Sequence, residues 1–242
     1  QVAAITTNDL KTLGTTAMAG LSAEQVGSLS PVQVASLSNA QVAGLSAAQF
    51  AGLGTDDLAA LSSIQIAVLG TAQVAALSGQ QLAAIETADI GALSTAALRA
   101  LGADQVAAFT SGQFAALSSA QAVALTADQI AGLGTANLNA LGTSQFAALS
   151  SAQVAAISAA QAAKLENADV AALSTAAVKG LSQEAIAALT AGQVVAMTSA
   201  QVGALSSGQM SAMTNADLAK LASADIKALS TAALAGLSAA QM

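Results

Sequence analysis

The chain has 242 residues, 55% of them hydrophobic, and a formal net charge of −7 that arises from 13 acidic and only six basic residues. It contains no Cys, His, Trp or Tyr, so most catalytic and metal-binding chemistry is excluded, and with so few basic residues to neutralise phosphates we expect no nucleic-acid partner. Gln and Ser interrupt every apolar run before it reaches the length of a bilayer, so no membrane span is predicted.

One eight-residue pattern repeats without insertion from end to end, as in SNAQVAGL at residues 38–45 and SAAQFAGL at residues 46–53. Numbered from its small polar residue, the octad has Ser, Thr or Gly at position 1 in 27 of 30 cases and Leu at position 8 in 24 of 30. Position 4 is Gln in 19 of 31 cases. Position 5 is large and apolar, with exceptions such as Ala122 and Ala162, and positions 6 and 7 are mostly Ala or Gly. A repeat this regular is typical of a solenoid or a fibre.

Two simple structures do not suit this octad. In one continuous helix, eight residues advance about 800°, so the apolar stripe would rotate by about 80° in each repeat and no partner could cover it. In a strand, positions 5 and 8 would point to opposite faces, and Ala is a poor strand former. The pattern therefore predicts one short helix in each octad.

The octad contains its own helix-start signals. With position 1 as the N-cap, its hydroxyl accepts from the backbone N–H of position 4, and the position-4 Gln reaches back to the N-cap N–H, which forms a capping box. The position-8 residue that precedes each cap packs on position 5 of the next helix as a hydrophobic staple. Leu37 with Val42 and Leu69 with Val74 are examples.

Proline and glycine test this assignment. Pro31 occupies position 2, the first helical residue, where its missing N–H has no cost. Gly54, Gly70 and Gly134 occupy position 1. Each of these glycines fits either an N-cap or a helix-ending residue with a positive φ.

Helices of six or seven residues, about 10 Å long, are not stable in isolation and must pack on neighbours. We therefore predict an all-α fold, a single-layer α-solenoid with one short helix in each octad and three or four octads in each turn. Positions 5 and 8 are predicted to lie inside and positions 2 to 4 largely outside. The small residues at positions 6 and 7 are predicted to let backbones approach closely.

No linker or change of composition divides the sequence, so residues 1–242 are predicted to form one array. The chain starts at position 4 and stops at position 5 of an octad. We therefore expect a segment of a longer array, or a unit that stacks on copies of itself.

A longer period of 80 residues is superimposed on the octads. Either a block of ten octads was duplicated without structural meaning, or the block spans a whole number of superhelical turns. The period is carried by acids or Asn at position 4, which are Asp9, Asp57, Asp89, Asn137, Asp169 and Asp217.

Three of these acids are followed ten residues later by a cation, which predicts surface ion pairs of low energy. The pairs are Asp89 with Arg99, Asp169 with Lys179, and Asp217 with Lys227.

No catalytic, cofactor-binding or metal-binding residue is predicted, and we do not expect an enzyme. Asp56 and Asp57 are the densest carboxylate pair, but a calcium ion needs six or more oxygen ligands and no calcium-binding loop is present. The serines lack a His base, so their hydroxyls are predicted to act as caps. Four aromatic residues at positions 5 and 8 are predicted to fill the core, namely Phe50, Phe109, Phe114 and Phe146.

Two polar rows run along the predicted coil. The position-4 Gln residues can form a hydrogen-bonded ladder between successive turns, in addition to capping. Thr and Ser at position 2, such as Thr71, Thr95, Thr135 and Thr231, form an exposed row. This row is either a set of solvated helix starts or a surface for a repetitive ligand such as ice or a glycan.

The motif Thr71-Ala-Gln-Val-Ala-Ala-Leu-Ser78, repeated with small variations along the chain, resembles octapeptide-repeat tracts of very large bacterial secreted and cell-surface proteins. These are grouped with adhesins, haem-utilisation/adhesion proteins and type I secretion substrates. The resemblance implies an extracellular or cell-surface location and carries no functional residues over. With Met as the sole haem-ligand type present, haem binding is not expected.

Composition and regularity lead to two functional hypotheses. The first is a structural extracellular fibre or stalk segment that self-associates end to end or laterally into filaments. Its alternative is a binding module whose repetitive surface acts as an adhesin for a glycan, ice or a partner protein on a cell surface. Neither hypothesis requires a cofactor.

Overall fold

The computed structural model describes residues 2–241, and these residues are organised in short helices without any strand. The chain opens with a 3-10 helix, η1, at Val2–Ala4. The α-helices that follow have four to six residues each, which is shorter than the six or seven predicted. They are shorter because the chain is already extended at position 8, as at Leu45 with φ −66° and ψ 137°. The all-α fold is confirmed.

The described chain forms two compact units, Gln1–Ala124 and Leu125–Met242. In the first unit the α-helices are α1 (Thr7–Thr12), α2 (Thr15–Ala19), α3 (Ala23–Gly27), α4 (Pro31–Ala35), α5 (Asn39–Gly44), α6 (Ala47–Ala51), α7 (Thr55–Ala59), α8 (Ser63–Ala67), α9 (Thr71–Ala75), α10 (Gly79–Ala84), α11 (Thr87–Ile90), α12 (Thr95–Ala100), α13 (Ala103–Ala107), α14 (Ser111–Ala116) and α15 (Ser119–Ala124).

In the second unit the helices are α16 (Ala127–Ala131), α17 (Thr135–Asn139), α18 (Thr143–Ala148), α19 (Ser151–Ala155), α20 (Ala159–Ala162), α21 (Asn167–Ala172), α22 (Thr175–Val178), α23 (Gln183–Ala187), α24 (Ala191–Ala196), α25 (Ser199–Ala204), α26 (Ser207–Ala212), α27 (Asn215–Leu218), α28 (Ser223–Ala228) and α29 (Thr231–Leu234).

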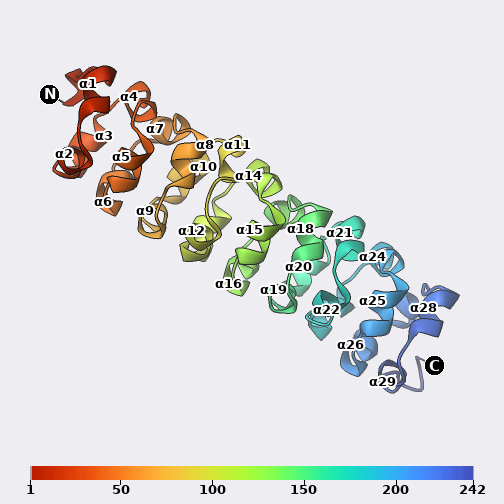
Figure 1. Cartoon of the computed structure of the whole chain (residues 1–242). Coiled ribbons are helices and arrows are strands. Elements are labelled where there is room, and N and C mark those ends of the chain that lie inside the picture. The colour runs from red at the N-terminus through yellow and green to blue at the C-terminus, as the bar shows by residue number, and fades with distance from the viewer. Residues whose placement is uncertain (1, 242) are drawn as a thin grey trace. The chain divides into compact units, whose positions relative to one another are not determined.

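Inside each unit a helix packs on the helix three places later in the chain. In the first unit α3 contacts α6, α6 contacts α9 and α9 contacts α12, and in the second α18 contacts α21 and α21 contacts α24. Figure 1 shows α2, α6, α9 and α12 along one edge of the first unit, so one step of four helices is followed by two steps of three. A turn of the coil therefore takes between three and four octads, and the predicted α-solenoid is confirmed.

A whole number of turns in ten octads is compatible with this pitch, because three turns of between three and four octads span nine to twelve. The structural interpretation of the 80-residue period therefore stays a prediction, alongside duplication.

Most helices begin as the octad predicts, the exceptions being α11, α21 and α28, whose N-cap residues are Glu86, Glu166 and Ala222. In α5 the Ser38 hydroxyl accepts from the Gln41 N–H at 3.3 Å, and the Gln41 Oε1 accepts from the Ser38 N–H at 2.8 Å. Pro31 is the first residue of α4. This reciprocal cap satisfies two of the N–H groups that a helix start leaves without partners.

Glycine at position 1 acts as an N-cap and not as a helix-ending residue with a positive φ. Gly54, Gly70 and Gly134 have φ values of −74°, −77° and −65° with extended ψ values. The first of the two predicted roles is therefore confirmed at all three positions.

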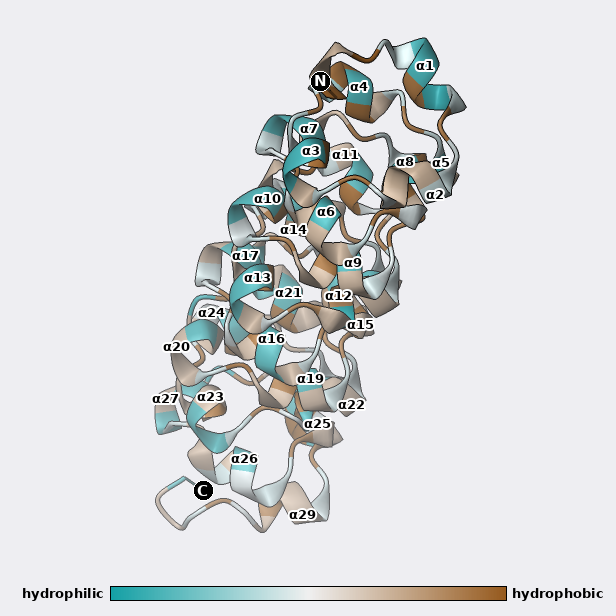
Figure 2. Cartoon of the chain, turned by 90° about the vertical axis from the view of Figure 1, so that its left-hand side faces the viewer, coloured by the Kyte–Doolittle hydropathy of each residue, from teal (hydrophilic) through white to brown (hydrophobic). Residues whose placement is uncertain are grey.

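The core follows the predicted pattern at positions 5 and 8. Val42 and Leu45 are buried, and Ala122 and Ala162 are also buried at position 5 in spite of their small size. Positions 2 and 3 of the same octads are mostly exposed. Figure 2 shows hydrophobic stretches recurring along the links between helices, while hydrophilic residues lie on the helices.

Position 4 was predicted to lie outside, and this prediction is wrong. Gln41 is only 2% exposed, because its side chain connects two turns of the coil. Its Oε1 caps its own helix, while its Nε2 donates to the carbonyls of Leu10 and Leu13, each at 2.8 Å, at the end of the helix four octads earlier. The Gln residues are thus both caps and a ladder.

We call this arrangement, an Oε1 bond to the N-cap N–H and Nε2 bonds to the carbonyls 31 and 28 residues earlier, a glutamine bridge. It recurs at Gln49, Gln65, Gln73, Gln113, Gln121, Gln161, Gln193, Gln201 and Gln209.

Positions 6 and 7 bring backbones of successive turns into contact, as predicted from their small residues. A Cβ added at Gly27 would lie 2.3 Å from the Gly52 carbonyl oxygen, and one at Gly180 would lie 2.1 Å from the Ser151 carbonyl oxygen. Both distances are far below van der Waals contact, so a side chain at Gly27 or Gly180 would require the neighbouring backbone to move.

None of the described helices could cross a lipid bilayer, because the longest has six residues and a spanning helix needs about 20.

The assignment of inside and outside can be tested in the second unit. Leu133→Asp places a carboxylate at a buried position 8 and should lower the free energy of unfolding by about 3–5 kcal/mol. Thr135→Asp, on the exposed position 2 two residues later, should change it by less than about 0.5 kcal/mol. Urea unfolding followed by circular dichroism measures both, and equal effects would contradict the assignment.

The glutamine bridge can be tested by an apolar substitution of similar size. Gln201→Leu removes the bonds to Thr198 N, Val170 O and Leu173 O and leaves buried backbone groups without partners, so we expect a loss of about 2–4 kcal/mol. The matched control is Gln25→Leu, because exposed Gln25 only caps its own helix and should lose about 1 kcal/mol or less. Thermal unfolding compares the two, and equal losses would show that the bridge adds nothing to capping.

Candidate functional site

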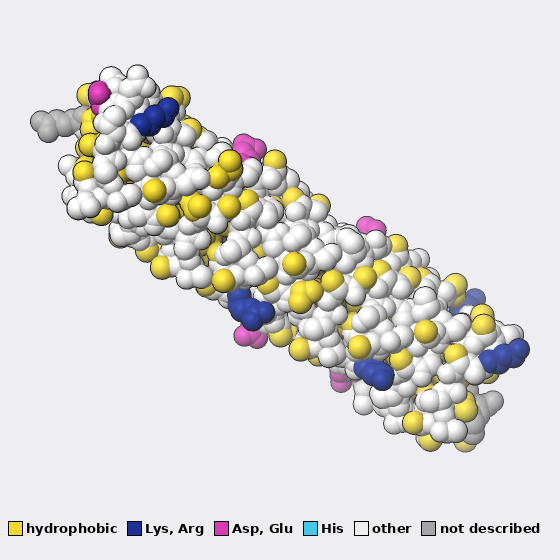
Figure 3. Space-filling model, viewed as in Figure 1, with side chains coloured by type: hydrophobic (Ala, Val, Ile, Leu, Met, Phe, Trp, Pro, Cys, Tyr) yellow, Lys and Arg dark blue, Asp and Glu magenta, His cyan; other side chains and the backbone are white. Residues whose placement is uncertain are grey.

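The surface offers little concentrated chemistry. On the face shown in Figure 3 the Lys, Arg, Asp and Glu side chains are few, and in one place a basic side chain lies next to an acidic one. Within residues 2–241 no three Asp or Glu side chains gather where they could hold a metal ion. The features that remain include two hollows that are each lined by a cation, a set of buried acids and the exposed Thr row.

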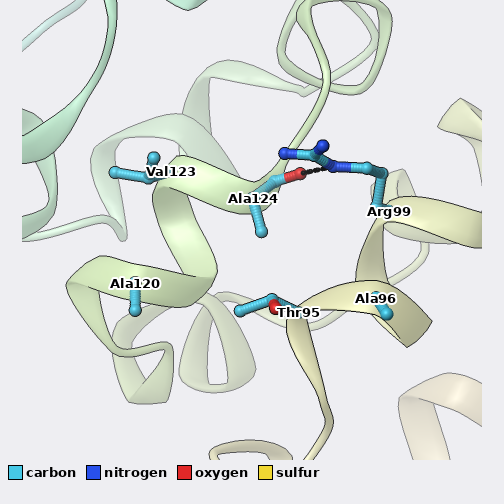
Figure 4. A pocket seen from close by; sticks show the side chains of 6 residues that line it. All are labelled: Thr95, Ala96, Arg99, Ala120, Val123 and Ala124. Atoms are coloured by element: carbon cyan, nitrogen blue, oxygen red, sulfur yellow. Dashed lines mark hydrogen bonds between the residues drawn. The ribbon is translucent and has the colours of Figure 1, made fainter.

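The first hollow lies in the first unit between α12 and α15 and has a volume of about 370 Å³. Arg99 and Thr95 of α12 face Val123 and Ala124 of α15 across it (Figure 4). The Arg99 Nε donates to the Ala124 carbonyl oxygen at 3.3 Å. The guanidinium therefore ties α12 to the following turn through an otherwise unpaired helix-end carbonyl.

A second hollow of about 640 Å³ occupies the corresponding place in the second unit, between α19 and α22. Its lining includes Ser151 and Ala155 of α19 and Lys179 and Gly180 beside α22. Each hollow thus presents one exposed cation among small residues. Such a site can attract a single carboxylate or a similar anion, and it offers no arrangement of a nucleophile with a base.

Arg99 occupies position 6 of its octad, where a long side chain can reach the next turn. Its side chain points across the groove to the position-7 carbonyl that lies 25 residues later in the chain, and Asn139 does the same, with its Nδ2 donating to the Lys164 carbonyl at 2.7 Å. Sequence reasoning missed this contact. The available signal was a long polar residue at a position where the other octads have mostly Ala or Gly.

The ion pairs expected from the ten-residue spacing are wrong. Among residues 2–241, Asp89 accepts instead from the Ser63 hydroxyl, Asp169 is buried, and Asp217 accepts from the Thr214 N–H and hydroxyl. The reason is geometric: position 4 points inward between two turns, while position 6 points outward across the groove. The buried acids Asp169 and Asp217 therefore do not face the exposed position-6 cations ten residues later.

Asp56 and Asp57 do not face a common site. Asp56 is exposed, whereas Asp57 is buried at position 4 and its Oδ2 accepts from the Gly54 N–H at 2.8 Å. Burial raises the pKa of Asp57 above its usual value, the Gly54 hydrogen bond lowers it, and the charge of Asp56 raises it further. Asp57 therefore caps α7 in the place of a Gln.

The pKa of Asp169 departs further from its usual value. Only 3% of this residue is exposed, and burial, with a smaller effect from the neighbouring Glu166 charge, raises its pKa to about 6. Asp57 accepts from the N–H of its N-cap residue, whereas Asp169 makes no such hydrogen bond, and α21 starts at Glu166 without a capping box.

The exposed Thr row exists. Thr71 and Thr95 start α9 and α12, which pack on each other in the first unit, and Thr135 and Thr231 start α17 and α29 in the second. All four are exposed. The row therefore consists of short local sets of hydroxyls on successive turns.

The four Phe residues are core residues, as predicted. Phe109 and Phe114 pack with ring centroids 5.9 Å apart at an interplanar angle of 51°, a favourable tilted arrangement.

Comparison with known families identifies the repeat. The chain belongs to the ALTTAQ repeat family, whose profile matches more than half of its length, at residues 2–39, 50–84, 82–119, 130–159 and 162–199. No curated protein matches the sequence.

Proposed function

We propose that the chain is a structural fibre or stalk segment of a bacterial protein, located outside the cell or on its surface, that holds other parts at a distance or self-associates into filaments. The observation that supports this proposal most is the glutamine bridge. Within each unit it ties successive turns together in a fixed register, as Gln41 does in the first unit and Gln201 in the second.

Further support comes from what the polar groups are used for. Position-1 hydroxyls cap their own helices, and position-4 amides join helix starts to helix ends of another turn. The outer positions carry mostly Ala, Ser and Thr. Functional sites in repeat proteins usually reside in loops that depart from the scaffold, and the octads have no insertion. Regularly stacked turns with a plain surface are suited to spacing and stacking.

Self-association would use the low surface charge and the exposed aliphatic residues. Val32 is 71% exposed and Ile64 is 66% exposed, and few like charges keep copies apart. We expect sedimentation to show species heavier than the 23.1 kDa single chain, and negative-stain images to show elongated assemblies. Compact particles that stay single at all concentrations would contradict the filament form of the proposal.

The contribution of the aliphatic residues has its own test. Val32→Glu with Ile64→Glu adds charge at both exposed positions and should weaken self-association by about tenfold or more, because each carboxylate would have to be desolvated in the contact. Thr55→Glu with Thr71→Glu adds the same charge at exposed helix starts of the same unit and serves as the control. Equal weakening by both pairs would indicate general repulsion and not an apolar contact.

A binding module is the second candidate. It is favoured by the packing of α9 on α12, because these helices start at the exposed residues Thr71 and Thr95. Thr71→Lys with Thr95→Lys should abolish binding to a glycan array or to ice without changing assembly, because the two hydroxyls would form part of one surface. Thr135→Lys changes the other unit. It should leave binding intact if the site is local to α9 and α12, and weaken binding if the ligand contacts a row along the whole chain. Unchanged binding in the double variant would overturn this candidate.

A further inference from the structure

The end of α17 contains buried acceptors that lack a donor. Leu141 is 0% exposed, and among residues 2–241 no group donates to its carbonyl oxygen, while the Asn139 Oδ1 is also buried without a hydrogen-bond partner. In the octad before, the corresponding carbonyl of Leu133 receives the Gln161 Nε2 at 2.8 Å. A buried carbonyl without a partner costs free energy, so a donor at this place would stabilise the contact between turns.

The register of the coil shows which side chain belongs at this place. A glutamine bridge always joins position 4 to the carbonyls 31 and 28 residues earlier, and for Leu138 and Leu141 that position is Asp169 of α21. Asp169 is only 3% exposed, and its side chain has no hydrogen-bond partner among the described residues. An ionised carboxylate only accepts, so it cannot replace the amide, whereas a neutral carboxyl has one O–H to donate.

We propose that Asp169 is a pH-sensitive joint in the second unit: its neutral carboxyl donates to the end of α17 in the place of a glutamine Nε2, and its ionisation releases this contact between turns. On ionisation the O–H bond breaks, the proton passes to water, and a carboxylate is left facing carbonyl oxygens. Repulsion and desolvation then favour a local opening that hydrates the carboxylate.

The charged groups around Asp169 are few. The helices in contact with α21, namely α18 and α24, contain no Asp, Glu, Lys or Arg, and neither does α17. On the approach to α21 the charged residues are Lys164 and Glu166, both exposed. The Glu166 charge opposes ionisation of Asp169, in the same direction as burial. No cation neutralises the ionised form, so the joint responds to protons alone.

The sign of the pH dependence follows from the raised pKa. Between the ordinary value of 3.8 and about 6, the folded state binds more protons than the unfolded state. Stability therefore falls as pH rises through this window and is greatest below it.

The first test is direct titration of the intact chain. Carbon-13 NMR of the Asp169 carboxyl should give a midpoint near pH 6, and amide exchange in α21, corrected for its intrinsic rate, should be faster at pH 8 than at pH 4.5 by about tenfold or more, the factor for one pKa unit. A midpoint near 4, or equal protection at both pH values, would overturn the proposal.

Substitutions give the second test. Asp169→Asn keeps the shape of the neutral acid and donates at every pH, and Asp169→Gln restores the bridging residue, so both should abolish the difference in α21 exchange between pH 4.5 and pH 8. Asp128→Asn removes an exposed acid of the same unit and should leave the difference intact. If the Asn and Gln variants retained the wild-type difference, the joint would not be Asp169.

Discussion

The structure depends on one constraint: helices of four to six residues leave most of their backbone N–H and C=O groups without partners inside the helix. The glutamine bridge supplies partners for both kinds of group, since one amide accepts from an N–H at the start of its own helix and donates to carbonyls at the end of another. Burial of positions 5 and 8 supplies the apolar driving force. The bridge determines which turn lies on which, because its reach is the same at Gln41 and at Gln209.

Because caps and bridges use most of the polar groups, the outer surface offers few groups for binding or catalysis. Where a longer side chain does occur at position 6, as at Arg99, its polar atoms are again used to tie one turn to the next. The candidate hollows are therefore by-products of stacking small residues, with a single cation in each. Spacing and self-association are functions that a surface of this kind can perform.

Acids at position 4 are the informative exceptions to the pattern. Asp57 keeps the capping half of the bridge and loses the half that reaches the earlier turn. At Asp169 both halves are absent in the charged state, so the turn it belongs to is held by packing and by its protonation. Contacts between turns in a solenoid are nearly independent of one another, which allows one turn to respond to pH while its neighbours stay closed.

The octad by itself determined the short helix, its cap and its apolar face, because capping and burial are decided by residues within eight of each other, as Ser38, Gln41 and Val42 show. The number of octads in each turn was decided by the packing of helices three places apart in the chain. Whether position 4 lies inside or outside was decided by the tertiary structure, since the partners of Gln41 are 28 and 31 residues away. The same holds for Arg99 and Asp89: a ten-residue spacing cannot show that Arg99 donates to the Ala124 carbonyl while Asp89 accepts from the Ser63 hydroxyl, because both partners belong to other turns.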